Sequence, residues 1–397
     1  MLHRRTLLAL ATTASVAIAT PIALTSTAQA STGTTAAVHF IGPKAPAAGK
    51  TAGKVTLRRA LSGVRRAKAS PSPSASASSS PAAPTSSPSP AVSHSASAST
   101  SPSASTRTFR SGVYVGAGDP SKVLAFETFR GSSADAVIEF LGDQDWLNIA
   151  DPEWTVGQWD AFSTTHHLVY HVPLVPKDGS GTLAAGAAGK YDGYFTQLAT
   201  MLVAHGQANV TLRLGAEMNL ASQPWTIGTT AEGASDYATY WRRVVTAMRA
   251  VPGAAFRFSW NVNNGLGTQP AENCYPGDAY VDEVGIDSYD WGWAPDGGPM
   301  SSAADRWTQI RAGNRGLDFW AAFAKQHGKK ITVPEWGLVS TSTDVHGGGD
   351  DTYYIQAMHD WLAAQDLGYE AYFDWGTFRI SGTGFPNAAA LYTSLWR

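Results

Sequence analysis

Short apolar runs alternate with amphipathic stretches along the chain from about residue 107 to its end. Eight of these runs predict buried strands, because they are short and rich in β-branched, leucine or aromatic side chains. The predicted strands cover residues 113–118, 146–150, 168–175, 210–214, 256–261, 284–289, 330–335 and 371–375.

The stretches between these runs have apolar residues at helical spacing. In one of them Phe195, Leu198 and Leu202 share a face, and Gly206 follows as a stop signal. The clearest predicted helices cover residues 194–205, 237–250, 317–327 and 352–367. Strands that alternate with helices, through connections long enough for crossovers, predict an α/β protein with a single closed (β/α)8 TIM barrel.

An open doubly wound sheet is the main alternative architecture. Its nucleotide-binding members carry a glycine-rich phosphate loop directly after the first strand. Here Gly112, Gly116 and Gly118 lie within and at the end of the first predicted strand, so this fingerprint is absent and we expect no cofactor. The sequence also has no His-Glu-x-x-His motif or other paired ligand spacing, so we expect no metal site.

Residues 1–30 have the pattern of an export signal. A basic start precedes an apolar run at 7–19, and Ala28, Gln29 and Ala30 provide the small residues of a cleavage site. The run is shorter than the roughly 20 apolar residues that a membrane span needs, so we expect no membrane span. The sequence thus predicts a secreted protein, extracellular or associated with the cell wall. It leaves open the choice between the general and the twin-arginine export route.

Two further segments precede the predicted barrel. Residues 31–68 form a basic segment that we expect to be poorly ordered, and its part from 57 to 68 is a candidate for contact with an anionic cell envelope. Residues 69–106 are almost entirely Ser, Ala, Pro and Thr, a composition typical of a disordered linker. The barrel domain is therefore expected to span residues 107–397.

Composition agrees with one large globular domain. All 14 tryptophans lie at or after Trp146, which locates the core in the C-terminal part of the chain. The single Cys274 excludes an internal disulfide. A formal net charge of −2 gives no support for nucleic acid as a partner. We expect a monomer.

Two of the predicted strands end on a glutamate. Residues 210–219 read Val-Thr-Leu-Arg-Leu-Gly-Ala-Glu-Met-Asn, with Glu217, and residues 330–337 read Lys-Ile-Thr-Val-Pro-Glu-Trp-Gly, with Glu335. A carboxylate is costly at the end of an apolar strand unless the site uses it. Two carboxylates in the mouth of one barrel supply the acid/base and the nucleophile of retaining glycoside hydrolysis.

A buried cation is predicted beneath this mouth. Because side chains alternate along a strand, Arg213, Gly215 and Glu217 are expected to share a face, with Arg213 about 13 Å deeper than Glu217. A buried guanidinium needs a carboxylate partner, and Asp287 and Glu335 are the two candidates.

Taken in strand order, these motifs resemble glycoside hydrolase family 26, the clan A family typified by β-mannanases. The resemblance covers residues 107–397. The residues that carry it are Arg213, Glu217, Met218 and Asn219, the run 285–289 with Asp287 and Tyr289, Glu335, and Trp375.

The resemblance implies a role for each residue. Glu217 would be the acid/base and Glu335 the nucleophile. Tyr289 would donate a hydrogen bond to the nucleophile, Asp287 would lie near it, and Trp375 would form the floor of the sugar subsite at the cleavage point. Arg213 and Asn219 are further candidates for substrate binding.

One departure from the family concerns the sugar. The family usually has His directly before the acid/base glutamate, and here Ala216 stands in that place. Substrate contact would then be lost or supplied by Asn219, His171 or Asn261. This departure bears on mannan specificity more than on the hydrolytic chemistry.

Further aromatic residues are candidates for sugar stacking. Trp291 and Trp293 follow the sixth predicted strand directly, and pyranose rings present apolar C–H faces to such side chains. The prediction is therefore an endo-acting retaining hydrolase of β-linked polysaccharide, most similar to endo-β-1,4-mannanases. The alternatives are a retaining β-glucanase or xylanase of the same clan and a carbohydrate-binding barrel that no longer hydrolyses.

Overall fold

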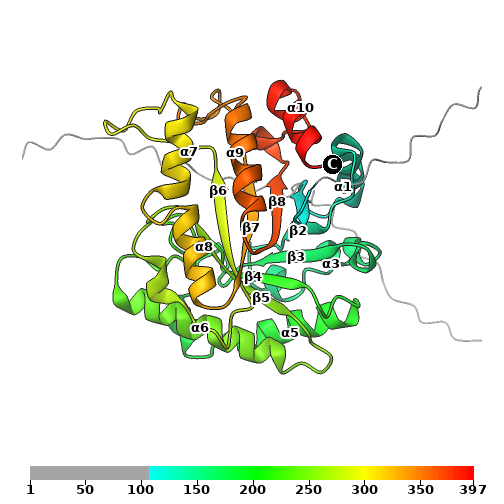
Figure 1. The fold of residues 1–397 in the computed structure, drawn as a ribbon. Helices are drawn as coiled ribbons and strands as arrows, with labels where there is room; N and C mark the ends of the chain where they lie inside the picture. Colours follow the sequence, from blue (N-terminus) through cyan, green and yellow to red (C-terminus); the bar gives the residue numbers. More distant parts are fainter. Residues whose placement is uncertain (1–106) are drawn as a thin grey trace, which may run out of the picture. The chain divides into compact units, whose positions relative to one another are not determined.

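The computed structural model describes residues 107–397 (Figure 1). The predicted export signal (1–30), basic segment (31–68) and linker (69–106) lie outside the described residues.

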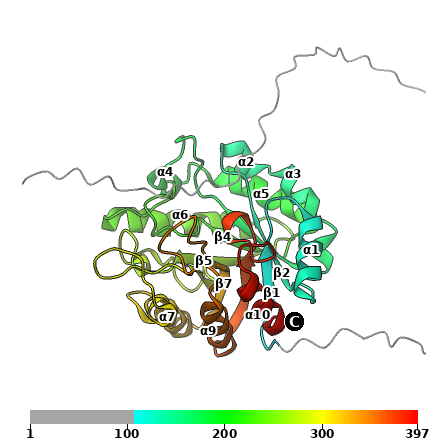
Figure 2. The same ribbon diagram turned by 90° about the horizontal axis from the view of Figure 1, so that it is seen from above.

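The eight strands form one closed parallel barrel in sequence order, and β8 pairs with β1 to close it (Figure 2). The strands are β1 Ser111–Tyr114, β2 Ala136–Phe140, β3 His167–Val172, β4 Thr211–Leu214, β5 Arg257–Asn263, β6 Glu283–Tyr289, β7 Lys330–Gly337 and β8 Leu367–Phe373. This confirms the predicted (β/α)8 barrel.

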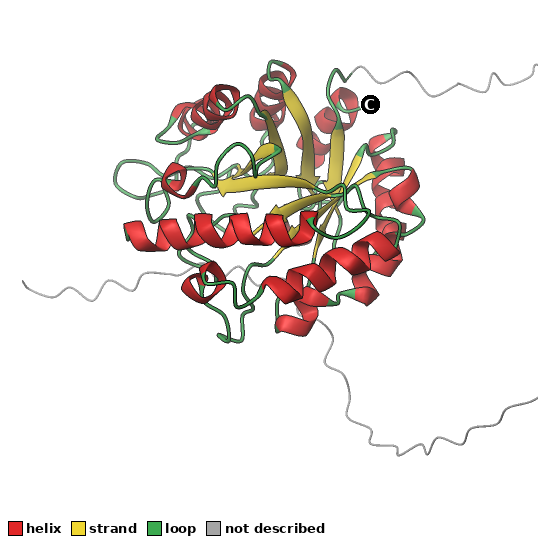
Figure 3. Cartoon of the chain, turned by 90° about the horizontal axis from the view of Figure 1, so that it is seen from below, coloured by secondary structure: helices red, strands yellow, loops and turns green. Residues whose placement is uncertain are grey.

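Helices surround the strands, as the view from below shows with strands in yellow and helices in red (Figure 3). The α-helices are α1 Pro120–Arg130, α2 Trp146–Ala150, α3 Glu153–Val156, α4 Leu183–Ala187, α5 Asp192–Ala204, α6 Ala231–Arg249, α7 Ala303–Ala312, α8 Leu317–Gln326, α9 Thr352–Ala363 and α10 Pro386–Leu395. Short 3₁₀ helices are η1 Gly157–Trp159, η2 Phe162–Thr164, η3 Ala271–Cys274 and η4 Gly376–Phe378. None of the helices of residues 107–397 is long and apolar enough to cross a membrane.

The core has two layers. Outward-facing strand residues such as Val137 and Leu212 pack against the helices in the larger cluster. Inward-facing residues such as Ala136, Ile138 and Val169 fill the barrel itself. The alternation along each strand therefore separates a helix-facing core from a barrel interior, which leaves the strand ends for polar side chains.

The second strand differs from its prediction. Residues 146–150 form helix α2, because the Asp145 side chain accepts a hydrogen bond from the Asn148 amide and caps the helix. The second strand is instead β2, whose apolar pattern is interrupted by the buried Glu139. The number of strands was predicted correctly, but the position of this one was wrong.

The fourth strand ends where it was predicted to end, but the residues after it are not extended. β4 ends at Leu214, and the backbone then turns through Gly215 (φ 48°) and Glu217 (φ 57°), both in the left-handed region. The predicted alternation of Arg213, Gly215 and Glu217 along one extended strand is therefore wrong. Glu217 still follows the C-terminal end of the strand, but a turn positions its side chain.

Candidate active site

Four polar side chains from three strands meet near the C-terminal ends of these strands. Arg213 lies on β4, Asp287 and Tyr289 lie on β6, and Glu335 lies on β7. Hydrogen bonds link all four, directly or through Arg213. The group occupies the C-terminal half of the barrel, the end at which enzymes of this fold place their sites.

Arg213 is the centre of this group. Its Nη2 donates to Asp287 Oδ2 and to Glu335 Oε1, at 2.7 Å each, and its Nε donates to Asn261 Oδ1 at 3.3 Å. Burial opposes the positive charge, but Asp287 and Glu335 outweigh this effect and raise the pKa of Arg213. Both carboxylates that the sequence offered as partners are therefore used.

Glu335 has a donor for each of its oxygens. Arg213 binds Oε1, and the Tyr289 hydroxyl donates to Oε2 at 3.2 Å. Burial, reinforced by Glu335, raises the pKa of Tyr289 well above its usual value, so the phenol keeps its proton. The two bonds fix the orientation of the Glu335 carboxylate, which is 4% exposed.

Glu217 is held by two side-chain amides. Asn263 Nδ2 donates to Oε1 at 2.7 Å, and Gln223 Nε2 donates to Oε2 at 2.8 Å. Burial first, and then the charge of Glu335, raise the pKa of Glu217 to about 7, although both amides and Arg213 oppose the shift. Glu217 therefore holds its proton in mildly acidic solution, as a general acid must.

Gln223 and Asn263 were not predicted from the sequence. Gln223 lies six residues after Glu217, and Asn263 ends β5. The only sequence signal for Asn263 is a polar residue at the C-terminal end of a buried strand.

Asp287 is fully buried. Its Oδ2 accepts from Arg213 and also from Asn261 Nδ2 at 2.7 Å. Burial raises the pKa of Asp287 well above its ordinary value, and the Arg213 guanidinium opposes this shift. Asp287 therefore forms an ion pair with Arg213, and its side chain has no contact with solvent.

Asn219 positions another residue of the site. Its Nδ2 donates to the Asn263 carbonyl at 2.9 Å, and its Oδ1 accepts from the Asn263 amide at 2.9 Å. The side chain is completely buried. Asn219 thus holds the backbone of Asn263, whose side chain in turn holds Glu217.

The position before Glu217 lies inside the protein. Ala216 is fully buried, and its carbonyl accepts from Trp225 Nε1 at 2.7 Å.

His171 is aligned with Arg213 across β3 and β4, and its ring lies against Trp225 and Phe140. Burial, and next the charge of Arg213, lower the pKa of His171 well below its usual value, so its imidazole is neutral. Of the three candidate replacements for the missing histidine, His171 is a neutral imidazole that is 7% exposed, whereas Asn219 and Asn261 are fully buried.

The predicted sugar-stacking tryptophans differ in exposure. Trp293 is 46% exposed and stacks on His346, with ring centroids 5.4 Å apart. Trp291 is half-buried and packs against Tyr289 at 5.4 Å. Trp375 is half-buried, and the Lys122 ammonium lies 4.8 Å from the centre of one of its rings.

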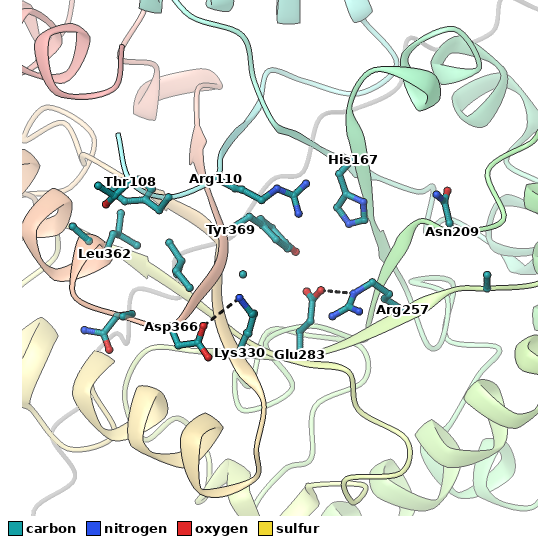
Figure 4. A pocket seen from close by; sticks show the side chains of 16 residues that line it. Thr108, Arg110, His167, Asn209, Arg257, Glu283, Lys330, Leu362, Asp366 and Tyr369 are labelled. Atoms are coloured by element: carbon teal, nitrogen blue, oxygen red, sulfur yellow. Dashed lines mark hydrogen bonds and ion pairs between the residues drawn. The ribbon is translucent and has the colours of Figure 1, made fainter. Parts of the chain in front are cut away.

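The barrel has a polar cavity at its other end. It measures about 870 Å³ and is lined by residues at the starts of the strands, including His167, Arg257, Glu283 and Lys330 (Figure 4). Arg257 pairs with Glu283 at 2.8 Å, and Lys330 pairs with Asp366 at 3.2 Å. Charge pairs at this end of a barrel contribute to its stability, whereas catalysis uses the opposite mouth. Within residues 107–397, no three His, Cys, Asp or Glu side chains form a group that could hold a metal ion.

Fold and site together define the class of protein, a (β/α)8 barrel with paired carboxyl groups at the C-terminal ends of β4 and β7. The model of glycosyl hydrolase family 26 matches residues 187–331, a range that contains Arg213, Glu217 and Asp287. The chain is therefore similar to this family over residues 187–331, and the resemblance predicted from the sequence is confirmed there.

A named relative matches about half of this chain. Endoglucanase H of Acetivibrio thermocellus is 27% identical over 212 residues, which are 51% of this chain and 22% of that protein. The chain thus matches about a fifth of that relative's length.

Solved structures share the fold. A GH26 beta-mannanase from Bacteroides ovatus aligns with a TM-score of 0.52 and 14% identity, over 74% of this chain and 89% of that chain. GH26C from Muricauda sp. MAR_2010_75 aligns with a TM-score of 0.53 and 16% identity, over 73% and 85%.

Proposed function

We propose that this protein is a retaining, endo-acting glycoside hydrolase that cleaves a β-1,4-linked polysaccharide. The observation that carries the proposal is the contrast between two carboxyl groups in one barrel mouth. Glu217 is buried and holds its proton up to about pH 7, whereas Glu335 is oriented by a cation and a phenol. This contrast is what an acid and a nucleophile require.

In the first step Glu335 attacks the anomeric carbon of the bound sugar. A bond forms between its carboxylate oxygen and that carbon, while the glycosidic C–O bond breaks. The proton of Glu217 passes to the departing oxygen, which leaves as the hydroxyl group of the released sugar chain. Arg213 and Tyr289 hold the nucleophile during the attack.

In the second step water hydrolyses the glycosyl ester. The negative charge of Glu335 is absent from the ester, so one cause of the raised Glu217 pKa disappears and Glu217 acts as the base. Glu217 takes a proton from water, the oxygen of water bonds to the anomeric carbon, and Glu335 leaves as a carboxylate. Two inversions at one carbon retain the configuration.

The favoured substrate is a β-1,4-mannan, from the likeness to mannanases. A β-glucan is the second candidate, because Ala216 replaces the histidine that the family usually has and because the matched relative is named an endoglucanase. The test incubates the purified protein with mannan, glucomannan, mixed-linkage β-glucan and xylan, and mass spectrometry measures the product lengths. The polymer that is cleaved fastest identifies the substrate. A ladder of oligosaccharides supports endo action, and release of single sugars alone contradicts it.

The alternative is a barrel that binds carbohydrate without hydrolysing it. The Glu335→Gln variant separates the two functions, because an enzyme loses turnover and keeps ligand binding. A wild-type protein that binds polysaccharide and shows no turnover on any of the four polymers would favour the binding function.

Proton NMR of the earliest products tests the stereochemistry. We expect the first anomer released from a β-linked oligosaccharide to be β, followed by slow mutarotation. An initial α-anomer would overturn the retaining mechanism.

Secretion, the monomeric state and cell-envelope contact are further proposals. The export-signal pattern at 1–30 supports secretion, and residues 57–68 supply the basic side chains for envelope contact. Cell fractionation tests secretion, and light scattering of the purified protein tests the monomeric state. Co-sedimentation with isolated envelopes, compared for the protein with and without residues 57–68, tests envelope contact.

A further inference from the structure

Trp154 and Leu147 are the two most exposed large apolar side chains on α2, α3 and the neighbouring loop after β1. Trp154 is 60% exposed, although tryptophan is highly buried on average in folded proteins. It lies in α3, in the connection between β2 and β3. A single exposed apolar residue is common, so exposure alone indicates nothing about function.

The position of Trp154 links it to the catalytic mouth. A Cβ added at Gly118 would lie 3.2 Å from Cζ3 of Trp154, and a Cβ at Gly116 would overlap the ring of Trp375. Both glycines belong to the loop that follows β1 at the C-terminal end of the barrel. Their Cα atoms are at most about 7 Å apart, because they are two residues apart in the chain. The two indoles therefore flank one short loop at the rim.

A buried carboxyl group fixes this loop. Glu139 Oε2 accepts from the Gly118 amide at 2.6 Å and from Trp159 Nε1 at 2.7 Å, and Glu139 itself is completely buried. Gly116 (φ 104°) and Gly118 (φ 64°) adopt left-handed backbone that other residues avoid. The loop is thus held in place, and with it the spacing between the two tryptophans.

The exposed indole is suited to a sugar. Its flat apolar face matches the C–H face of a pyranose, and a rigid two-torsion side chain loses little entropy on binding. Gln158 is exposed and lies on the same side of Gly118, where its amide offers a donor and an acceptor for hydroxyl groups.

We propose that Trp154 is the platform of a remote sugar-binding subsite, which takes a pyranose unit of the same polysaccharide chain that is cleaved at Glu217 and Glu335. Trp375 and Trp154 lie against the same loop, at Gly116 and Gly118, and Glu139 positions this loop through the Gly118 amide. The inference rests on the proposed function, because it requires a chain long enough to reach from the cleavage point to Trp154.

The test compares substrates of different length. The kcat/KM of wild type, Trp154→Ala and Trp154→Phe is measured on the β-1,4-linked trisaccharides and hexasaccharides of mannose and of glucose. Trp154→Ala is expected to lower the hexasaccharide-to-trisaccharide ratio of kcat/KM about three- to tenfold, and Trp154→Phe to restore part of it. An unchanged ratio in Trp154→Ala overturns the proposal.

Leu147→Ala is the matched control. Leu147 is 64% exposed on the neighbouring helix α2 and has no aromatic ring, so the ratio should stay at the wild-type value. A fall as large as that of Trp154→Ala would show that the loss is not specific to the indole and would overturn the proposal. Melting temperatures of all variants are compared, and exposed positions are expected to change them little.

A second measurement separates this inference from the proposed function. If wild type cleaves neither series and none of the four polymers, the hydrolase is refuted. Affinity electrophoresis in gels containing glucomannan or mixed-linkage β-glucan then tests the platform alone. Retardation of wild type that is reduced in Trp154→Ala and kept in Leu147→Ala supports the platform. Equal retardation of all three proteins, or none, overturns it.

Discussion

The Nη2 atom of Arg213 donates to Oε1 of Glu335 at 2.7 Å, across 122 positions of sequence. The same atom also binds Asp287, so one guanidinium serves two buried carboxyl groups. A buried ion cluster is costly to assemble and more costly to break, because removal of one member leaves the others without a counter-charge. Arg213 therefore couples the orientation of the proposed nucleophile to the stability of the barrel.

Replacement of Arg213 by Met should destabilise the protein strongly. Two buried carboxyl groups would lose their cation, and we expect a loss of about 3–5 kcal/mol in the free energy of unfolding, measured by urea denaturation. The double variant Arg213→Met with Asp287→Asn is the control, because it removes one of the uncompensated charges and should recover part of the loss. A loss below about 1 kcal/mol in the single variant would contradict the charge-cluster account.

The two glutamates should respond differently to the leaving group. Glu217→Ala should impair hydrolysis of polysaccharide far more than hydrolysis of activated aryl glycosides, whose departure needs little proton donation. Azide should rescue the activated substrate, because a small anion fits the space of the missing base. Glu335→Ala should abolish turnover of both substrates. Equal losses for Glu217→Ala on every substrate, without rescue, would show that the roles are exchanged or that Glu217 is structural.

The pH profile should carry the signature of Glu217. Because its pKa is about 7, the acid form is lost as pH rises through 7, and kcat/KM should fall on that side. In Gln223→Ala the ionised form of Glu217 loses its 2.8 Å hydrogen bond from Gln223, so the pKa of Glu217 should rise further. The fall of kcat/KM on the basic side should then shift to higher pH by about 0.5–1 pH unit. Gln269→Ala is the control, since the Gln269 amide donates to the backbone carbonyls of residues 227, 228 and 230, whereas the side chains that bond to Glu217 are Gln223 and Asn263. A limb that stays in place in Gln223→Ala would exclude this role for the amide.

Backbone strain at Glu217 should appear as a trade between stability and activity. Glu217 has φ 57°, a left-handed conformation that costs a side chain with a Cβ about 1–2 kcal/mol. Glu217→Gly should therefore be more stable than Glu217→Ala by about 1 kcal/mol in denaturant unfolding, although both variants lack the acid. An alanine variant as stable as the glycine variant would show that the turn is unstrained.

The buried Glu139 should make stability depend on pH. Burial raises the pKa of Glu139 from 4.5 to about 7, so the folded state binds a proton that the unfolded state has released between these values. Its contribution to the free energy of unfolding should fall as pH rises from 4.5 to 7, by up to about 3 kcal/mol. Unfolding of Glu139→Gln over this range should lack that part of the slope, whatever its absolute stability. Parallel pH curves for wild type and variant would refute the shift.

The sequence by itself predicted the closed barrel, its number of strands and two glutamates, Glu217 directly beyond β4 and Glu335 near the end of β7. These features follow from local patterns: a buried strand needs a short apolar run, and a carboxylate at its end is unfavourable without a use. Periodicity carries information about burial, and the order of strands in a parallel barrel follows the order of the chain.

Tertiary structure decided which polar groups meet. The second strand contains Glu139, which is tolerated inside the protein because the Gly118 amide and Trp159, distant in sequence, satisfy it. Trp146–Ala150, which has the composition of a strand, is a helix because Asp145 caps it. An apolar pattern cannot reveal a buried polar residue whose partners come from other loops.

The partners of the catalytic candidates were decided in the same way. Arg213 had two possible carboxylates in the sequence, and the barrel brings both within 2.7 Å of one nitrogen. Gln223 and Asn263 reach Glu217 only because the chain leaves β4 through a left-handed turn and β5 ends beside it. Hydrogen bonds depend on distance and direction between side chains from different elements, and these are set when the strands close into a barrel.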